Sequence, residues 1–195
     1  MFNKIKHYGV IGCYKLFLSL IYTKVFHPTA KLIRLPIDIR GMHNIYFGCG
    51  FVSGFNCRIE TYNVGKIFFG KNCQINDYVH IAANSSIIIG DDCLIASKVF
   101  ISDLNHGFYS GEKQSNPIDI CSKRELDSNP IVIGNNVWIG ESCSILPGVN
   151  IGKNVIIGAN SVVTKSFQDN VIIAGNPAII IKKWNEIKNE WDKVN

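Results

Sequence analysis

The feature that most limits how this chain can fold is a large aliphatic residue that recurs every six positions. From Ile133, steps of six reach isoleucine at positions 139, 145, 151 and 157 and valine at position 163. The same step connects Ile89 with positions 95 and 101, and Phe69 with positions 75 and 81. A helix repeats every 3.6 residues or so and a strand every two, so neither produces a sustained period of six. Three short strands joined by tight corners do produce it, and the sequence therefore predicts a triangular coil with six residues in each wall.

Tetrads of the approximate form I-x-[IF]-[GA] mark successive coils. They begin at positions 45, 67, 87, 131, 149 and 171, and the eighteen residues between 131 and 149 equal three walls of six. We expect the coils to stack about 4.8 Å apart, so that each strand pairs with those above and below it. The residue four positions after each aliphatic is usually small or β-branched. Where it is cysteine we interpret the thiol as a compact interior side chain, which applies to Cys57, Cys73, Cys93 and Cys143.

These patterns predict an all-β chain, a parallel β-helix with a helical segment at each end. The β-helix is expected over residues 45–177, after an N-terminal helical or capping segment over residues 1–44. The six-residue pattern stops after Ile101 and resumes at Ile131, so residues 103–130 are expected to leave the coil as a loop. Long excursions from rigid scaffolds usually carry function. Apolar residues at positions 180, 184, 187 and 191 then predict a C-terminal α-helix over residues 178–195.

Charge is concentrated near the N-terminus. The first forty residues contain seven lysines and arginines against one acidic residue, whereas the whole chain carries a net charge of only +5. The rest of the chain is therefore close to neutral, and we expect no nucleic-acid partner. Lys15 and Lys24 interrupt the apolar stretch from Tyr8 to Phe26, and we expect the uncharged run from Leu16 to Thr23 to be too short to span a bilayer. This segment is expected to cap the open end of the coil or to lie against an anionic membrane surface.

The cysteines and the N-terminal sequence also bear on location. Seven cysteines without a C-x-x-C pair do not suggest a disulfide framework or a zinc ribbon. The first apolar run is a poor secretory signal because Lys15 lies inside it. We therefore expect a reduced protein in the cytoplasm, with possible attachment to the inner face of the membrane.

Several segments of the later coils carry a more specific pattern. They are Val137-Trp138-Ile139-Gly140, Ile145-Leu146-Pro147-Gly148-Val149-Asn150-Ile151-Gly152, the run from Val155 to Lys165, and Ala174-Gly175-Asn176-Pro177-Ala178. In these segments the chain resembles the hexapeptide-repeat acyltransferases, and among them the sugar O-acetyltransferases that act on galactosides and maltose or decorate lipopolysaccharide and capsule. The resemblance covers about residues 45–183. It implies a left-handed β-helix and a homotrimer that binds acetyl-CoA between neighbouring subunits, beside a carbohydrate acceptor.

His106 lies at the start of the long loop, where the family keeps its catalytic histidine. Acetyl transfer to an alcohol needs a base that removes the hydroxyl proton as the oxygen attacks. An imidazole with a pKa of about 6.5 suits this task at neutral pH. The resemblance thus implies that His106 is the general base, with no metal required, and that Asp103 or a main-chain carbonyl orients its ring. The other histidines, at positions 7, 27, 43 and 80, are expected to be structural or surface residues.

For the acceptor, the resemblance implies Asn76 and Asn84 as ligands of its hydroxyl groups. Arg124, in the loop, is a further candidate for acceptor contact. An ordinary role at a tight corner would explain both asparagines equally well, and simple solvation would explain the arginine.

For coenzyme A, the family positions fall on Trp138, Glu141, Ala159, Thr164, Lys165 and Lys182. Trp138 would cover the pantetheine arm or pack between subunits, and Lys182 would meet phosphate. A second basic position of the family falls on Ile179 instead, which weakens the expected phosphate binding unless Lys183 compensates.

Three other functions use the same fold and stay open at this point. N-acetylation of a nucleotide-linked amino sugar would need the same histidine. Carbonic anhydrases built on this coil need three zinc-binding imidazoles with a close pair in the later coils, but no histidine follows His106. A purely structural coil needs no active site at all.

Overall fold

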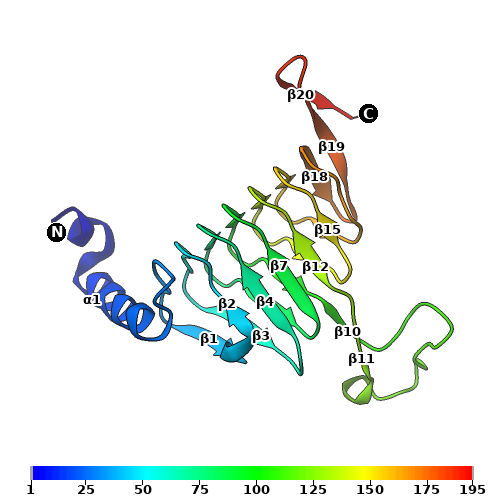
Figure 1. Ribbon diagram of the computed structural model, residues 1–195, viewed down its shortest axis with the longest axis horizontal. Helices are drawn as coiled ribbons and strands as arrows, with labels where there is room; N and C mark the ends of the chain where they lie inside the picture. The colour runs from blue at the N-terminus through cyan, green and yellow to red at the C-terminus, as the bar shows by residue number, and fades with distance from the viewer. Residues whose placement is uncertain (1, 195) are drawn as a thin grey trace.

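Three sheets wrap around a common interior and form the walls of a triangular coil (Figure 1). The structure is a computed structural model that describes residues 2–194. Wall A contains β5 (Gln74–Ile75), β8 (Leu94–Ile95), β13 (Trp138–Ile139), β16 (Ile156–Ile157), β18 (Val171–Gly175), β19 (Ala178–Asn185) and β20 (Glu190–Lys193). Wall B contains β1 (Ile37–Arg40), β3 (Cys57–Thr61), β6 (His80–Ala83), β9 (Phe100–Ser102), β14 (Ser144–Ile145) and β17 (Val162–Val163). Wall C contains β2 (Ile45–Tyr46), β4 (Lys66–Phe69), β7 (Ser86–Ile89), β12 (Ile131–Ile133) and β15 (Asn150–Ile151).

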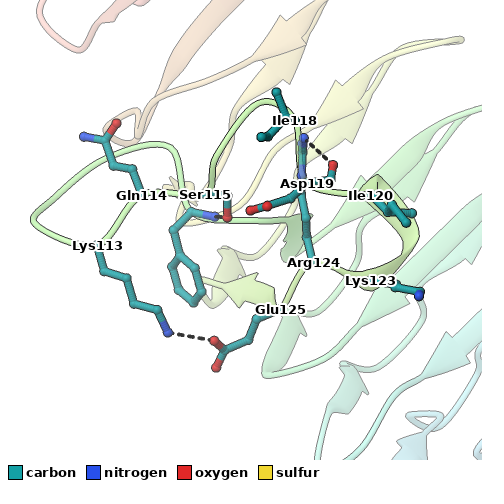
Figure 2. A pocket seen from close by; sticks show the side chains of 10 residues that line it. Lys113, Gln114, Ser115, Ile118, Asp119, Ile120, Lys123, Arg124 and Glu125 are labelled. Carbon is teal, nitrogen blue, oxygen red and sulfur yellow. Dashed lines mark hydrogen bonds and ion pairs between the residues drawn. The ribbon is translucent and has the colours of Figure 1, made fainter.

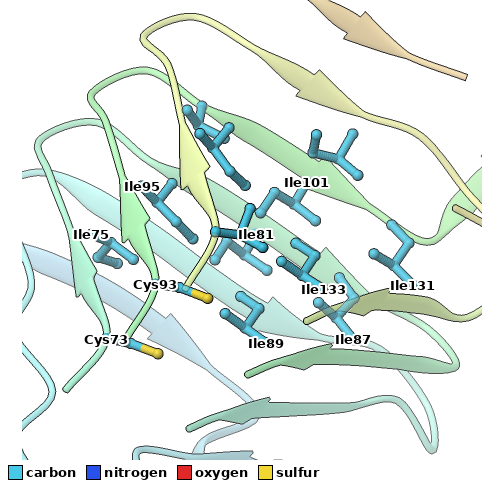
Figure 3. Packing of buried hydrophobic residues seen from close by; sticks show 14 of the residues in the cluster. Cys73, Ile75, Ile81, Ile87, Ile89, Cys93, Ile95, Ile101, Ile131 and Ile133 are labelled. Carbon is cyan, nitrogen blue, oxygen red and sulfur yellow. The ribbon is translucent and has the colours of Figure 1, made fainter. Parts of the chain in front are cut away.

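The coil confirms the predicted left-handed parallel β-helix, with about seven turns. Residues one coil apart lie directly opposite each other in parallel strands: Ile59, Ile81 and Ile101 form one such column in wall B. All three side chains are fully buried. The six-residue period is therefore the length of one wall, and each large aliphatic packs on its counterparts in the adjacent coils (Figure 3).

The four cysteines at the small interior positions are buried and free, as expected. Each thiol lies against a main-chain carbonyl of an adjacent coil; the Cys57 Sγ lies 3.0 Å from the Asn76 oxygen and the Cys73 Sγ 2.9 Å from the Gly90 oxygen. Burial is the main reason why the pKa of the Cys57 thiol is raised to about 11. Figure 3 shows Cys73 and Cys93 in this interior position, where a neutral thiol fills a small space and satisfies a carbonyl.

The corners are held by backbone contacts that leave little room for side chains. A Cβ added to Gly134 would lie 2.7 Å from the nitrogen of Lys153 in the next coil. Aspartates bridge successive corners: Asp91 Oδ1 accepts a hydrogen bond of 2.7 Å from the main-chain nitrogen of Lys71, and Asp169 Oδ1 accepts one of 2.9 Å from that of Lys153. The corners thus stack through fixed polar contacts, and the interior stacks through apolar ones.

The long loop leaves the coil without disturbing its register (Figure 1). Ile101 pairs with Ile145, and Ile89 pairs with Ile133, so the coils on either side of the loop stay in contact. The loop starts and ends as an antiparallel ribbon of β10 (Leu104–His106) and β11 (Leu126–Ser128), with the short helix η2 (Cys121–Lys123) between them. The excursion predicted for residues 103–130 is therefore present.

The N-terminal segment divides into a helix and a first coil. Helix α1 (Phe2–Phe26) agrees with the predicted helical segment and is interrupted at Gly9, whose φ is 66°. The coil begins earlier than the expected residue 45, because Leu32 bridges to Val52 and β1 pairs with β3. This first coil, which also includes the short helix η1 (Met42–Asn44), lacks the regular tetrad, so its sequence did not reveal it.

The prediction of a C-terminal helix over residues 178–195 is wrong. The described part of that segment forms an antiparallel hairpin of β19 and β20, which extends wall A beyond the last coil. Trp184 and Trp191 lie directly opposite each other, with ring centroids 5.3 Å apart. The hairpin places these rings together as a helix would have done, and it also pairs the open edge of β18.

Candidate active site

The corner between walls B and C carries a connected set of polar side chains beneath the loop. Asp103 is fully buried, and its two carboxylate oxygens accept main-chain hydrogen bonds of 2.7 Å from Asn84 and 2.9 Å from Ser85. The Asn84 amide donates to the Ser128 hydroxyl at 2.6 Å and accepts from Asn63 at 2.7 Å. Because Ser128 lies on β11, this network fixes the base of the ribbon to the coil.

His106 is exposed at the outer end of β10, two residues beyond the backbone pair that joins Leu104 to Ser128. Its carbonyl accepts a hydrogen bond from the Tyr109 hydroxyl. Among the described residues, no side chain hydrogen-bonds to its ring in the single chain. The imidazole is thus held by its backbone and left accessible to a ligand. Its role as the general base stays a prediction.

The contacts of Asp103 differ from the expected one. Its oxygens hold the Asn84 and Ser85 backbone, and the contacts described for the carboxylate do not include the His106 ring. Asp103 therefore positions the corner from which the ribbon leaves. A direct effect on the imidazole stays a prediction that substitution can test.

Arg124 organises the loop. Its guanidinium donates to the Tyr109 hydroxyl at 2.9 Å and to the carbonyls of Pro117 and Asp119 at 3.0 Å each. Arg124 and Asp119 help to line a hollow of about 580 Å³ within the loop (Figure 2). Since Tyr109 in turn contacts the His106 carbonyl, the arginine supports the segment that carries the histidine. Contact of Arg124 with an acceptor stays a prediction.

A row of side chains runs along the outer face of wall A and leads away from the corners. Trp138, which is 50% exposed, pairs with Ile156, and Ile156 pairs with Ile172. Ile172 faces Lys182 on β19, and Lys182 faces Lys193 on β20. Opposed lysines repel each other unless an anion lies between them. The arrangement suits a ligand with an apolar arm and a phosphate-bearing end, and Lys193 was missed because a helix was expected there.

The predicted site residues fall at two different corners of the coil. One set lies at the corner between walls A and B, near Trp138, and contains Asn76, Glu141 and Ala159. The main-chain nitrogen of Asn160, the residue after Ala159, donates a hydrogen bond to the carbonyl of Glu141. Thr164 and Lys165 lie at the corner between walls B and C, with Asn84 and His106. The width of wall B, at about 3.3 Å per residue, keeps the two corners more than about 15 Å apart. One chain does not bring the two sets together.

A second polar group lies on the outer face of wall B and was missed in the sequence. Glu60 is 2% exposed, and its carboxylate contacts Arg58 at 2.7 Å and His80 at 3.0 Å. Arg40 lies 3.6 Å away. Burial raises the pKa of Glu60, but the hydrogen bonds from Arg58, His80 and Tyr62 outweigh it and hold the pKa below its usual value. The signal was present in the sequence, because residues 58 and 80 occupy the same position in successive coils.

Comparisons with known proteins agree with this geometry. Residues 130–165 match the family described as bacterial transferase hexapeptide (six repeats). The chain is 47% identical over 189 residues to WbbJ of Escherichia coli K12, provisionally named a lipopolysaccharide biosynthesis O-acetyl transferase, and the match covers 96% of both proteins. The chain belongs to the hexapeptide-repeat acyltransferases.

Two further members of the family are similar over less of their length. A dTDP-4-amino-4,6-dideoxy-D-glucose acyltransferase of Escherichia coli is 36% identical over 140 residues, which are 68% of this chain and 72% of that protein. A galactoside acetyltransferase whose structure was solved in complex with coenzyme A is 31% identical, with a TM-score of 0.50, and the match covers 82% of this chain and 72% of that one. Membership of the family identifies this chain as an enzyme of acyl transfer.

Proposed function

We propose that this acyltransferase moves the acetyl group of acetyl-CoA to a hydroxyl of a sugar in a surface polysaccharide, such as the O-antigen of lipopolysaccharide, or in its precursor. The observation that carries the proposal is an exposed histidine on a ribbon that a buried aspartate network fixes to the coil. The similarity to WbbJ over nearly the whole chain supports the acceptor class.

In this proposal His106 takes the proton of the acceptor hydroxyl as that oxygen attacks the thioester carbonyl. The tetrahedral intermediate then collapses, the carbon–sulfur bond breaks, and the imidazolium returns its proton to the departing thiolate. Asn84 is close enough to the ribbon base to hold an acceptor hydroxyl, although its amide already donates to Ser128. No acyl-enzyme is formed.

The positions of the site residues support a trimer. One set of predicted ligands lies at the corner between walls A and B, and the other lies with His106 at the far end of wall B. Acetyl-CoA held in a cleft between two adjacent chains would touch one set from each of them. In such an assembly each subunit would supply the histidine to one cleft and Trp138 to another.

The outer row of wall A supports the binding of the donor. From Trp138 to Lys182 the row crosses three strand spacings of about 4.8 Å, a length of roughly 14 Å. The indole and the two isoleucines would cover the pantetheine arm, and Lys182 with Lys193 would meet the phosphates. This second lysine compensates for the missing basic residue at position 179.

Transfer to the amino group of a nucleotide-linked sugar is the second candidate, favoured by the similarity to the dTDP-amino sugar acyltransferase. The two candidates differ in the acceptor and share the geometry. Incubation with labelled acetyl-CoA and matched hydroxyl and amino acceptors separates them, because only the correct class incorporates label in proportion to enzyme.

The His106→Ala variant tests the assigned base. We expect its turnover to fall by about 10²–10⁴-fold, with unchanged melting temperature and coenzyme A affinity. His43→Ala, which alters another exposed histidine, in the short helix η1 of the first coil, is the matched control and should keep full turnover. Wild-type turnover in the His106 variant, or an equal loss in both variants, would contradict the assignment.

A further inference from the structure

Helix α1 packs on the coil through its polar side chains. Ser19 and Thr23 are both fully buried. The Ser19 hydroxyl accepts a hydrogen bond of 3.0 Å from the main-chain nitrogen of Leu35, and the Thr23 hydroxyl accepts one of 2.8 Å from that of Ile33. The helix therefore uses its hydroxyl-bearing face to contact the first coil.

The opposite face of α1 carries large apolar side chains that no residue in the described part of the chain covers. Val25 is 65% exposed, Tyr14 62% and Phe17 59%, and Leu18 and Ile21 are also exposed. At about 100° per residue these five side chains share one broad side of the helix, turned away from Ser19 and Thr23. A helix that packs on a soluble domain normally has the reverse arrangement, with its apolar face inward.

The lysines of the helix border this apolar face on its two sides. By the same helical geometry Lys15 lies on one border and Lys24 on the other, and both are exposed. No acidic residue precedes Asp38 in the sequence. Asp77 of the coil lines a hollow together with Lys15, but no ion pair joins either lysine to a carboxylate among the residues that the structure describes. Apolar side chains flanked by long basic ones are typical of helices that lie in the plane of an anionic bilayer surface.

A hollow next to the helix continues this order of apolar and basic groups. It has a volume of about 350 Å³, and it is lined by Leu18, Leu35, Pro36, Ile37 and, at its polar side, Lys15. A phospholipid offers the complementary order, with an anionic phosphate above an apolar chain. A protein partner would be expected to place carboxylates against these lysines. A second copy of this chain has no acidic residue before Asp38 in its own N-terminal segment, so the lipid is the favoured occupant.

We propose that α1 anchors the enzyme flat on an anionic phospholipid surface, with Phe17 and Ile21 in the acyl region and Lys15 and Lys24 at the phosphates. The stretch Tyr8–Phe26, with 19 residues and a mean hydropathy of 1.3, is long and apolar enough by composition to cross a membrane. A crossing would put lipid on every side of it, whereas Ser19 and Thr23 are in contact with the coil. The helix therefore lies in the interface. This inference does not depend on the reaction proposed above.

Co-sedimentation of the full-length protein with vesicles tests the anchor. We expect binding to vesicles that contain phosphatidylglycerol, and weak binding to pure phosphatidylcholine. The double variant Phe17→Glu/Ile21→Glu should lower the partition coefficient onto the vesicles by at least about tenfold. It removes two large apolar groups and adds negative charges, which the anionic surface repels. Ile187→Glu, at the tip of the C-terminal hairpin and 98% exposed, is the matched control and should bind like the wild type.

The charged border is tested separately. Lys15→Gln/Lys24→Gln should lower binding to anionic vesicles by about fivefold for each lysine, with little effect on neutral ones. Unchanged vesicle binding in both double variants would overturn the proposal. So would a change in oligomeric state by sedimentation velocity without a change in vesicle binding, since a second copy of the chain would then cover this face. Circular dichroism of each variant shows whether the helix and coil are retained.

Discussion

Substitution of Asp103 by asparagine gives the clearest test of how the loop is attached. The wild-type carboxylate is fully buried and accepts two main-chain hydrogen bonds, from Asn84 and Ser85. The asparagine side chain keeps one acceptor oxygen but turns its amide nitrogen toward the second main-chain N–H. One buried donor then loses its partner and faces another donor.

The expected cost follows from these contacts. A hydrogen bond to a charged group contributes about 1.5–3 kcal/mol net, and a buried group left without a partner costs about 1–3 kcal/mol. Because one neutral hydrogen bond survives, we expect Asp103→Asn to lower the free energy of unfolding by about 2–4 kcal/mol. In a chain of this length that corresponds to a melting temperature lower by roughly 5–12 °C.

The assay is thermal unfolding by calorimetry, at one protein concentration because an oligomer melts in a concentration-dependent way. Asp91→Asn is the matched control. Its carboxylate also accepts a main-chain hydrogen bond across a corner, but near solvent, so we expect a loss of about 1 kcal/mol or less. The pH dependence of kcat/KM is measured on the same samples.

Two results would refute the reasoning in different ways. If Asp103→Asn melts within about 2 °C of the wild type, the carboxylate does not hold the corner as its contacts indicate. If the melting temperature stays constant while the pH profile of kcat/KM changes, the main role of Asp103 is to orient the imidazole of His106.

Two further predictions concern the outer faces of the walls. The pKa of Glu60 is lower in the folded chain than its usual value, so this group adds stability that is complete above the unfolded pKa of about 4.3 and is lost as the pH falls through the folded pKa. Glu60→Gln should therefore flatten the fall of the melting temperature below about pH 5, and parallel curves for the two proteins would contradict this. Lys182→Ala should weaken coenzyme A binding by about tenfold in calorimetry, with no effect on a pantetheine thioester that lacks the nucleotide. Lys183→Ala, which alters the next residue on the other face of β19, should bind coenzyme A normally; an equal loss there would mean that simple charge explains the effect.

The repeating part of the fold was predictable because its period is set by geometry alone. Three walls of six residues place Ile151 beside Ile133 and Ile157 beside Ile139, whatever the distant sequence does. The C-terminal segment was not predictable by the same means. An interval of seven residues between Trp184 and Trp191 brings the rings together in a helix and equally in a hairpin with a four-residue turn. The choice depends on β18, whose open edge the hairpin pairs, and this tertiary contact is absent from the local pattern.

The candidate site was predictable in its position but only partly in its contacts. The break in the repeat located the loop and therefore His106. The contacts were not predictable because they join distant residues. Asp103 accepts its hydrogen bond from the main chain of Asn84, 19 residues earlier, and Arg124 donates to Tyr109, 15 residues earlier. The Glu60 cluster depends on stacking in the same way, since His80 reaches it from the next coil.

The undisturbed pairing on either side of the excursion has a consequence for how such enzymes diversify. Because Ile101 meets Ile145 and Ile89 meets Ile133 as if no residues intervened, the scaffold places no demand on the length or sequence of what lies between, beyond the ribbon at its base. A different excursion could therefore be inserted at this corner as a cassette, and the prism would continue to fold as before.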